Sequence, residues 1–343
     1  MSDPRDPHAQ YETIGSPVTA IRPGFDMEEA AVRLMLTAPS APALLDTLGI
    51  TGQDAEELLA LIPAVVEDPQ MLTAVTQGAN LLRRHVGLEA SPADLSAHTE
   101  AWNALQQPLA PGIGLIAILA HVVSTDVVRT FHRERGIDEA TSWATLADLG
   151  QQMRVHRTCS GRLGLLKHRW TALNWTGRLI ALGRLQFDLH RRRLPGRDEE
   201  QWLLGAHIPA TGPLEPAACD ESFRRARALA SEQFPDLGID GVIVCDSWMI
   251  SEGFREVLGP ESNLSRFAAR WEILSREDAT ADAIYFVFNR ENTKDRADLP
   301  RRTRLERALA ERISSGEGWQ GGLGLLRDPG AESDEGTDET GAA

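Results

Sequence analysis

The chain has 343 residues, of which 42% are hydrophobic and 25% charged, so it is long enough for about two globular domains that each bury a core. Its formal net charge of −15 disfavours binding to the phosphate backbone of nucleic acids. Cys159, Cys219 and Cys245 are far apart and lack zinc-site spacing, and the N-terminus is polar with no signal-peptide core. These features favour a cytoplasmic protein without a metal site or a membrane association.

The first half of the chain has the apolar spacing of helices. Residues 1–25 are polar with scattered Pro and Gly, which predicts a flexible lead-in. Over 26–157, apolar side chains recur every three or four residues, and no alternating pattern interrupts them. The most apolar run, 109–123, is shorter than the ~18 residues of a membrane-spanning helix, so we expect a buried core helix. The sequence predicts a helical domain here and offers no catalytic motif.

The second half shows strand patterns mixed with helices. Residues 185–189 and 202–208 alternate apolar with polar side chains, which predicts two antiparallel strands and a polar connection. A helix over 216–234 should follow, because Pro216 suits the first helical turn. The all-apolar segment 241–245 predicts a strand covered on both faces. Further along we expect a short helix at 251–258, strands at 267–273 and 283–288, a basic helix at 301–313 and an acidic disordered tail over 328–343.

Four segments of this second half resemble one protein family. They are LGRLQF at 182–187, HIPATGPLEP at 207–216, CDSW at 245–248 and SNLSRF at 262–267, and the similarity extends upstream through 143–157. They are similar to the actinobacterial acyltransferase-domain proteins, which join a helical N-acyltransferase N-terminal domain to a GNAT-like C-terminal domain. The resemblance implies an α+β chain, in which a GNAT-like mixed, largely antiparallel sheet with flanking helices occupies 158–327.

The resemblance also implies a reaction. An acyl group would pass from a thioester, on coenzyme A or on an acyl-carrier protein, to a small-molecule amine by direct attack, with no permanently bound cofactor. In a GNAT fold the thioester lies where two central strands splay apart, and a helix N-terminus holds the pyrophosphate. By this resemblance the cofactor-binding positions are Ile208, Thr211, Gly212 and, further along the helix, Arg224.

The loop before that helix leaves open other acyl donors and a non-catalytic function. Pro213 and Pro216 have no backbone N–H and Glu215 would repel a phosphate, whereas the family pattern is rich in glycine. The donor would then be an acyl-carrier protein, docked on the basic run 190–193 or 301–304, although such runs more often form a solvated face. The remaining alternative is a non-catalytic GNAT-like scaffold or partner-binding protein.

His207 is the expected general base. It lies on the strand that often carries the base in GNAT enzymes, and an imidazole pKa near ~6.5 suits it to accept a proton from an ammonium. Asp246 and Ser247 follow the apolar strand, where sites gather in open α/β sheets, and Ser247 would protonate the leaving thiolate through a water. Cys245 would form an acyl-enzyme with His207 as base. Each of these residues also has a purely structural alternative. His207 would be hydrogen-bonded within the sheet, Asp246 and Ser247 would form a turn or a cap, and Cys245 would be a buried small hydrophobic residue.

Three further residues are candidates for binding the substrate. Gln186 and Arg184 share the polar face of their strand, where they would orient a substrate or line an interface with the helical half. The pairing that keeps the other hairpin face apolar predicts Gln186 directly across from His207. Trp248 would form the core or a pocket wall. Asn263 precedes the next strand and would cap or pin that turn.

Overall fold

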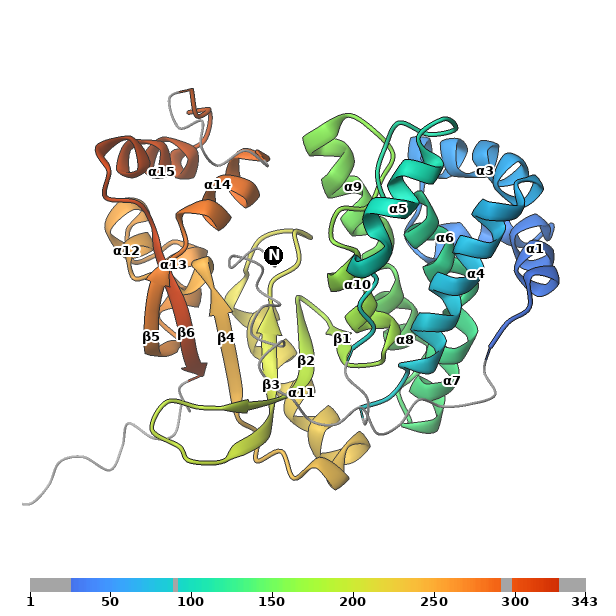
Figure 1. Ribbon diagram of the computed structural model, residues 1–343. Helices are drawn as coiled ribbons and strands as arrows, with labels where there is room; N and C mark the ends of the chain where they lie inside the picture. Colours follow the sequence, from blue (N-terminus) through green and yellow to red (C-terminus); the bar gives the residue numbers. More distant parts are fainter. Residues whose placement is uncertain (1–25, 89–91, 291–297, 327–343) are drawn as a thin grey trace, which may run out of the picture. The chain divides into compact units, whose positions relative to one another are not determined.

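The computed structural model describes residues 26–88, 92–290 and 298–326 (Figure 1). The expected lead-in, 1–25, and tail, 328–343, lie outside these ranges. The chain forms two compact units. The first unit runs to His190 and includes Ile208–Ala210 and Ser222–Leu237; the second contains Arg191–His207, Thr211–Glu221 and the chain from Gly238 onward.

The first unit begins with a series of helices, as the apolar spacing predicts. They are α1 (Glu29–Thr37), α2 (Ala41–Thr47), α3 (Gly52–Glu67), α4 (Pro69–Arg84), α5 (Ser96–Gln106), α6 (Leu115–Val123), α7 (Thr125–Glu134), α8 (Glu139–Leu146), α9 (Asp148–Ser160) and α10 (His168–Trp175).

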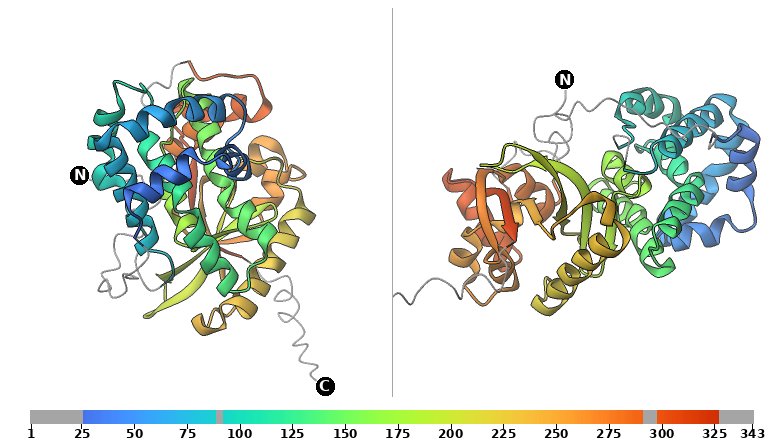
Figure 2. Two further views of the ribbon diagram at one scale, coloured as in Figure 1. Left: turned by 90° about the vertical axis from the view of Figure 1, so that its right-hand side faces the viewer. Right: turned by 90° about the horizontal axis from the view of Figure 1, so that it is seen from below.

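Helix α6 lies at the centre of these helices. Every one of its residues is buried, and it contacts α1, α4, α5 and α10 (Figures 1 and 2). It begins after Gly114, whose φ of 76° suits glycine, and a Cβ there would approach the carbonyl oxygen of Leu165 to 2.5 Å. The apolar run is therefore a core helix, as expected. Among the described residues no single helix is long and apolar enough to cross a membrane, and two bent helix pairs reach that length and composition only together.

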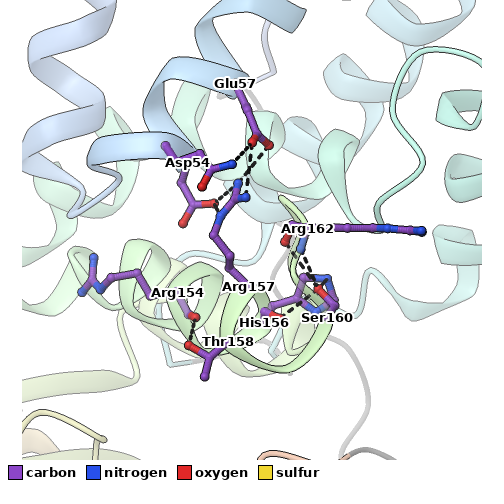
Figure 3. A network of polar contacts seen from close by, with 9 residues as sticks. Asp54, Glu57, Arg154, His156, Arg157, Thr158, Ser160 and Arg162 are labelled. Carbon is purple, nitrogen blue, oxygen red and sulfur yellow. Dashed lines mark hydrogen bonds and ion pairs between the residues drawn. The ribbon is translucent and has the colours of Figure 1, made fainter.

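An arginine joins α9 to α3 inside the first unit (Figure 3). Arg157 Nε donates to Asp54 Oδ1 at 2.7 Å, and its Nη2 lies 2.9 Å from Glu57 Oε2. Asp54 is only 4% exposed, so its carboxylate requires this partner. The bond from Arg157 is also the largest cause of the lowered pKa of Glu57. This ion pair network fixes the positions of two helices that are about a hundred residues apart in sequence.

The sheet has six strands in the order β1-β2-β3-β4-β6-β5. β3 pairs with β4 in parallel, whereas β1 with β2, β4 with β6 and β5 with β6 are antiparallel, so the expected mixed, largely antiparallel sheet is confirmed. The strands are β1 (Leu179–Leu182), β2 (Leu185–Arg193), β3 (Glu200–His207), β4 (Ile243–Ser247), β5 (Trp271–Asp278) and β6 (Gln320–Leu326).

The flanking helices confirm most expected elements and correct two. The expected strand at 267–273 begins only at Trp271, because Asn263–Ala268 form a helix. The expected strand at 283–288 is wrong, because these residues end helix α14. Ala283, Ile284 and Phe288 are buried at helical spacing, and Asn289 stops the helix with a φ of 53°. The helices are α11 (Pro216–Gln233), the 3-10 turns η2 (Pro235–Leu237) and η3 (Trp248–Ile250), α12 (Gly253–Leu258), α13 (Asn263–Ala268), α14 (Thr280–Phe288) and α15 (Arg304–Ser315).

Strand β6 was missed because its sequence, QGGLGLL, is rich in glycine. β6 lies between β4 and β5. Its Gly322 has a φ of 149°, and a Cβ there would lie 2.0 Å from the carbonyl oxygen of Ser275. The close approach of β5 excludes any larger residue, so the glycines that weaken the strand pattern are required by the packing.

Candidate functional site

The parallel pairing of β3 with β4 ends before either strand does. Leu204 pairs with Ile243 and Gly205 with Val244. Among the described residues the ladder between these two strands has no further pair, yet β3 continues to His207 and β4 to Ser247. The carboxyl ends of two central parallel strands therefore extend past their shared hydrogen bonds. This is the place at which the resemblance predicts the thioester.

Strand alternation sorts the candidate residues between the two faces of the sheet. Side chains two residues apart project from the same face, so His207 shares a face with Gly205, and Asp246 with Val244. Because Gly205 and Val244 are partners, His207 and Asp246 project from one common face. Cys245 projects from the opposite face. His207 is half-buried.

Asp246 forms an ion pair with Arg192, a residue of β2 that belongs to the second unit. Arg192 Nη1 lies 3.1 Å from Asp246 Oδ2, and the two side chains are 25% and 18% exposed. A small apolar cluster on the same face holds the adjoining part of the hairpin against β4 and β6, through Leu194, Leu203, Val244 and Leu323. The guanidinium is thus positioned by packing as well as by charge.

A second carboxylate faces this ion pair. The pKa of Glu277, on β5, is raised by loss of solvent around its carboxyl group and then by the negative charges of Asp246 and Asp282. Arg192 acts in the opposite direction and lowers it. Asp246, Asp282 and Arg192 therefore all act on the carboxyl group of Glu277 at this end of the sheet.

Cys245 has the environment of a structural thiol. It is 1% exposed, and burial followed by the charge of Asp246 raises the pKa of its thiol well above the usual value. The reactive form of cysteine is the thiolate, which this environment disfavours. Cys245 also projects from the face opposite to His207, the base that an acyl-enzyme mechanism would need.

Ser247 and Trp248 turn the chain at the end of β4. The backbone N–H of Met249 donates to Ser247 Oγ at 3.1 Å, so Ser247 caps η3, in keeping with the expected cap chemistry. Trp248 is 8% exposed, and its carbonyl oxygen accepts a hydrogen bond from Trp319 Nε1 at 3.0 Å. Trp248 is part of the core of the second unit, and its ring reaches the surface layer through a stack on Phe286.

The loop before α11 is exposed and held by a side chain. Thr211 and Gly212 are exposed, and Gly212 has a φ of 136°, which favours glycine. Asn263 Nδ2 donates to Glu215 Oε1 at 2.9 Å. Asn263, the first residue of α13, therefore pins this loop, whereas it was expected to cap or pin the turn before the next strand. Glu215 has a structural contact as well as a charge.

Basic side chains lie near the beginning of α11. Arg270 Nη2 donates to the carbonyl oxygen of Pro216 at 3.2 Å, and Arg270 pairs with Asp220. This guanidinium was not anticipated from the sequence, because it lies more than fifty residues from the helix. Arg224 is exposed, two turns into the helix.

Gln186 and Arg184 both have partners within the first unit. Gln186 is 5% exposed on β2, with Ala181 of β1 as its backbone partner. Arg184 Nη1 donates to the carbonyl oxygen of Pro209 at 3.1 Å, and so holds the segment in which Ile208 and Pro209 are half-buried. The expected position of Gln186 across from His207 stays a prediction.

The sequence reasoning missed a buried acid–imidazole pair on β2. His190 Nδ1 lies 2.9 Å from Asp188 Oδ2, and the two residues are 8% and 1% exposed. The run 190–193 was expected to form a solvated face, which is wrong for His190 because it is buried. Its spacing of two from Asp188 within an alternating segment was the available signal. No group of three or more potential metal ligands occurs within the described ranges.

Both halves of the chain match known protein domains. Residues 39–177 match the N-acyltransferase N-terminal domain and residues 179–326 the GNAT-like C-terminal domain. An acyltransferase solved in complex with decanoyl-CoA and teicoplanin is 27% identical, with a TM-score of 0.71 over 88% of this chain and 99% of that chain. A mutant acyltransferase in complex with octanoyl-CoA has the same identity of 27% and TM-score of 0.71, over 88% of this chain and 100% of its own. No protein with a curated description matches the sequence.

Proposed function

Because the chain belongs to the family that joins an N-acyltransferase N-terminal domain to a GNAT-like C-terminal domain, it is an acyltransferase with acyl-CoA as co-substrate, and we propose that it acylates the amine of a small molecule by direct attack. The observation that carries this proposal is the early end of the β3–β4 ladder, with His207 and Asp246 beyond it on one face. A thioester between the two strand ends would lie beside His207 and Asp246, which project from one face.

His207 is the general base in this proposal. It accepts a proton from the acceptor ammonium, and the resulting amine attacks the thioester carbonyl carbon. A backbone N–H near Ile208 stabilises the oxyanion that forms. The carbon–sulfur bond then breaks, and the thiolate takes, through water, the proton that the attacking nitrogen loses. Ser247 Oγ accepts from Met249 N–H, and by strand alternation Ser247 projects from the same face as Cys245, so it has no part in the proposed proton transfer.

Cys245 is not the nucleophile in this proposal. Its thiol is buried, its pKa is raised, and it projects from the face opposite to His207. An acyl-enzyme would require a thiolate within reach of a base. Direct transfer requires no thiolate on the protein, and it therefore accounts better for the observed environment of the cysteine.

The donor and acceptor follow from the structural relatives. The related acyltransferases bind decanoyl-CoA and octanoyl-CoA, and one binds teicoplanin, so we expect a medium-chain acyl-CoA and a small-molecule acceptor here. An acyl-carrier protein remains an alternative donor. The cytoplasmic location, the actinobacterial origin and the domain limits at 26–157 and 158–327 also remain proposals.

A melting-temperature screen against acyl-CoA thioesters of different chain length tests the donor. If one binds with a Kd near ~10 μM, ligand at ~1 mM should stabilise the fold by about 2.7 kcal/mol, a shift of a few degrees. Free coenzyme A and the free fatty acid are the controls, because each carries only half of the donor. Absence of any shift with all thioesters at ~1 mM would contradict acyl-CoA as the donor and favour a carrier protein or the scaffold alternative.

A further inference from the structure

Two consecutive carbonyl groups after β3 are held by side chains of the first unit. Arg184 Nη1 donates to the carbonyl oxygen of Pro209 at 3.1 Å, and Gln151 Nε2, on α9, donates to the carbonyl oxygen of Ala210 at 3.3 Å. All four residues belong to the first unit. They directly precede the loop 211–215, where the family resemblance places the pyrophosphate of the acyl-CoA donor.

Both of these side chains have further contacts that fix their positions. Ser222 Oγ, on α11, accepts from the backbone N–H of Arg184 at 3.0 Å, and Ser222 is 0% exposed. On α9, Gln151 Oε1 accepts from Arg154 Nη2 at 2.9 Å. Because the oxygen of the Gln151 amide has this partner, the NH₂ group is the end that faces the segment after β3. The two carbonyls are therefore bound by donors that are already in place.

The directions of these carbonyls determine the directions of two N–H groups. In a planar trans peptide group the C=O and the N–H point in opposite directions, and no cis peptide bond occurs among the described residues. The carbonyl of Pro209 points to Arg184, so the N–H of Ala210 points away from it. Likewise the N–H of Thr211 points away from Gln151. Neither N–H donates a hydrogen bond within the described part of the chain, so both are available to a ligand.

The loop that follows lacks two backbone donors. Pro213 and Pro216 have no N–H, whereas the glycine-rich pattern of the family would offer one at each position. A pyrophosphate is held mainly by backbone N–H groups that point toward it. In this chain the N–H groups of Ala210 and Thr211 lie just before the prolines, and their directions are fixed.

We propose that Arg184 and Gln151 are positioning residues for the acyl-CoA donor. By holding the two carbonyls, they direct the N–H groups of Ala210 and Thr211 at the pyrophosphate, and these donors replace the ones that the prolines remove. The inference rests on the acyltransferase function proposed above. It also gives the helical part of the chain a role in donor binding, because Gln151 lies on α9.

Equilibrium binding of two donors to the full chain, measured by calorimetry, tests this role. Decanoyl-CoA carries the pyrophosphate, whereas decanoyl-pantetheine has the same thioester and lacks it. Arg184→Met and Gln151→Met each remove one donor to a carbonyl and retain an unbranched side chain. Each should weaken decanoyl-CoA about fivefold and leave decanoyl-pantetheine within about twofold, because only the pyrophosphate contacts the released N–H groups.

Two further variants separate positioning from a general effect on the fold. Gln152→Met changes the neighbouring residue of α9, whose amide lies 3.4 Å from Asp148 Oδ2 instead of contacting the segment after β3, and it should bind decanoyl-CoA as the wild type does. Arg184→Lys retains a donor for the carbonyl of Pro209 and should recover part of the affinity that Arg184→Met loses. Equal weakening of both donors in Arg184→Met and Gln151→Met would overturn the inference, because it would show a structural effect.

The amide proton of Ala210 provides a direct measurement. In protein labelled with ¹⁵N-alanine, its resonance is identified by its absence in Ala210→Gly, and it should shift when free coenzyme A is added but not with decanoyl-pantetheine. An unshifted Ala210 resonance at saturating coenzyme A, or unchanged decanoyl-CoA affinity in both Met variants, would overturn the inference alone. Pyrophosphate-dependent binding with the expected losses, but without transfer to any amine, would support it and contradict the proposed function alone.

Discussion

Arg192 Nη1 and Asp246 Oδ2 lie 3.1 Å apart, and this ion pair links the end of the β2–β3 hairpin to the end of β4. Both side chains are mostly buried, so neither charge is fully solvated if the other is removed. The pair therefore holds the hairpin against the strand end at which the proposed acyl transfer takes place.

Breaking this pair should destabilise the fold. Arg192→Met keeps most of the side-chain volume but leaves Asp246 facing Glu277 without a counter-charge, and we expect a loss of about 1–3 kcal/mol in the free energy of unfolding. Asp246→Asn in the same background should recover part of that loss, because the unpaired charge is gone. Urea unfolding of the two single variants and the double variant measures the coupling. Additive effects would show that the two charges do not stabilise each other.

Replacing Cys245 should preserve turnover. Cys245→Ser substitutes a hydroxyl, which cannot act as an equivalent nucleophile, so direct transfer predicts kcat within about threefold of the wild type, since no catalytic step is removed. Stability should fall by about 1–2 kcal/mol, because a buried thiol becomes a more polar group. Cys245→Ala serves as the control, because it removes the thiol without adding a polar group. A folded Cys245→Ser protein with kcat reduced a hundredfold or more would restore the acyl-enzyme mechanism.

The charge of Glu215 should oppose coenzyme A binding if the pyrophosphate lies at the start of α11. Glu215→Gln removes that charge but retains an oxygen that can accept from Asn263 Nδ2. We therefore expect coenzyme A to bind about two- to fivefold more tightly, with thermal stability unchanged. Isothermal titration calorimetry measures the affinity. Unchanged or weaker binding would place the pyrophosphate elsewhere.

Two buried histidines should make the fold sensitive to acid. Burial lowers the pKa of both His121 and His132 to about 4, whereas an unfolded histidine titrates near ~6.5. As pH falls from ~6.5 toward ~4 the unfolded chain gains protons that the folded chain does not, so stability is lost in this window at up to about 1.4 kcal/mol per pH unit for each histidine.

The variant His132→Asn tests the acid effect, because Asn can replace the contact of Nδ1 with Ser142 Oγ at 2.9 Å. Urea unfolding between pH 7 and pH 5 should show a smaller loss of stability in this variant than in the wild type. The exposed His98 provides the matched control, and His98→Asn should retain the wild-type slope. An equal pH dependence in all three proteins would contradict a neutral, buried His132.

The helices and the central strands could be predicted from the sequence because their cores are patterned locally. The apolar run of α6 and the alternation of β2 each carry their own signal. β6 carries no such local signal. Glycine is required at position 322 because the carbonyl oxygen of Ser275, on the neighbouring strand, leaves no room for a Cβ, and this contact depends on the tertiary fold. The run at 283–288 was taken for a strand because a short apolar segment fits a buried helix equally well.

The candidate site was partly visible in the sequence. His207, Asp246 and Ser247 were placed correctly at strand ends, because the end of a strand can be recognised from its pattern. Their partners could not be predicted. Arg192 contacts Asp246 across 54 residues, and Phe286 reaches Trp248 from a helix that had been expected to be a strand. Long-range pairing of this kind has no local signature in one sequence.

The central claim is direct acyl transfer with His207 as the base, and His207→Ala tests it most directly. Release of free coenzyme A from decanoyl-CoA in the presence of a panel of small primary amines measures turnover, with melting temperature as the check on folding. The account predicts a fall in kcat of roughly 10²–10⁴-fold, with the fold intact and the affinity for decanoyl-CoA preserved. A folded His207→Ala protein with near-normal turnover would contradict it.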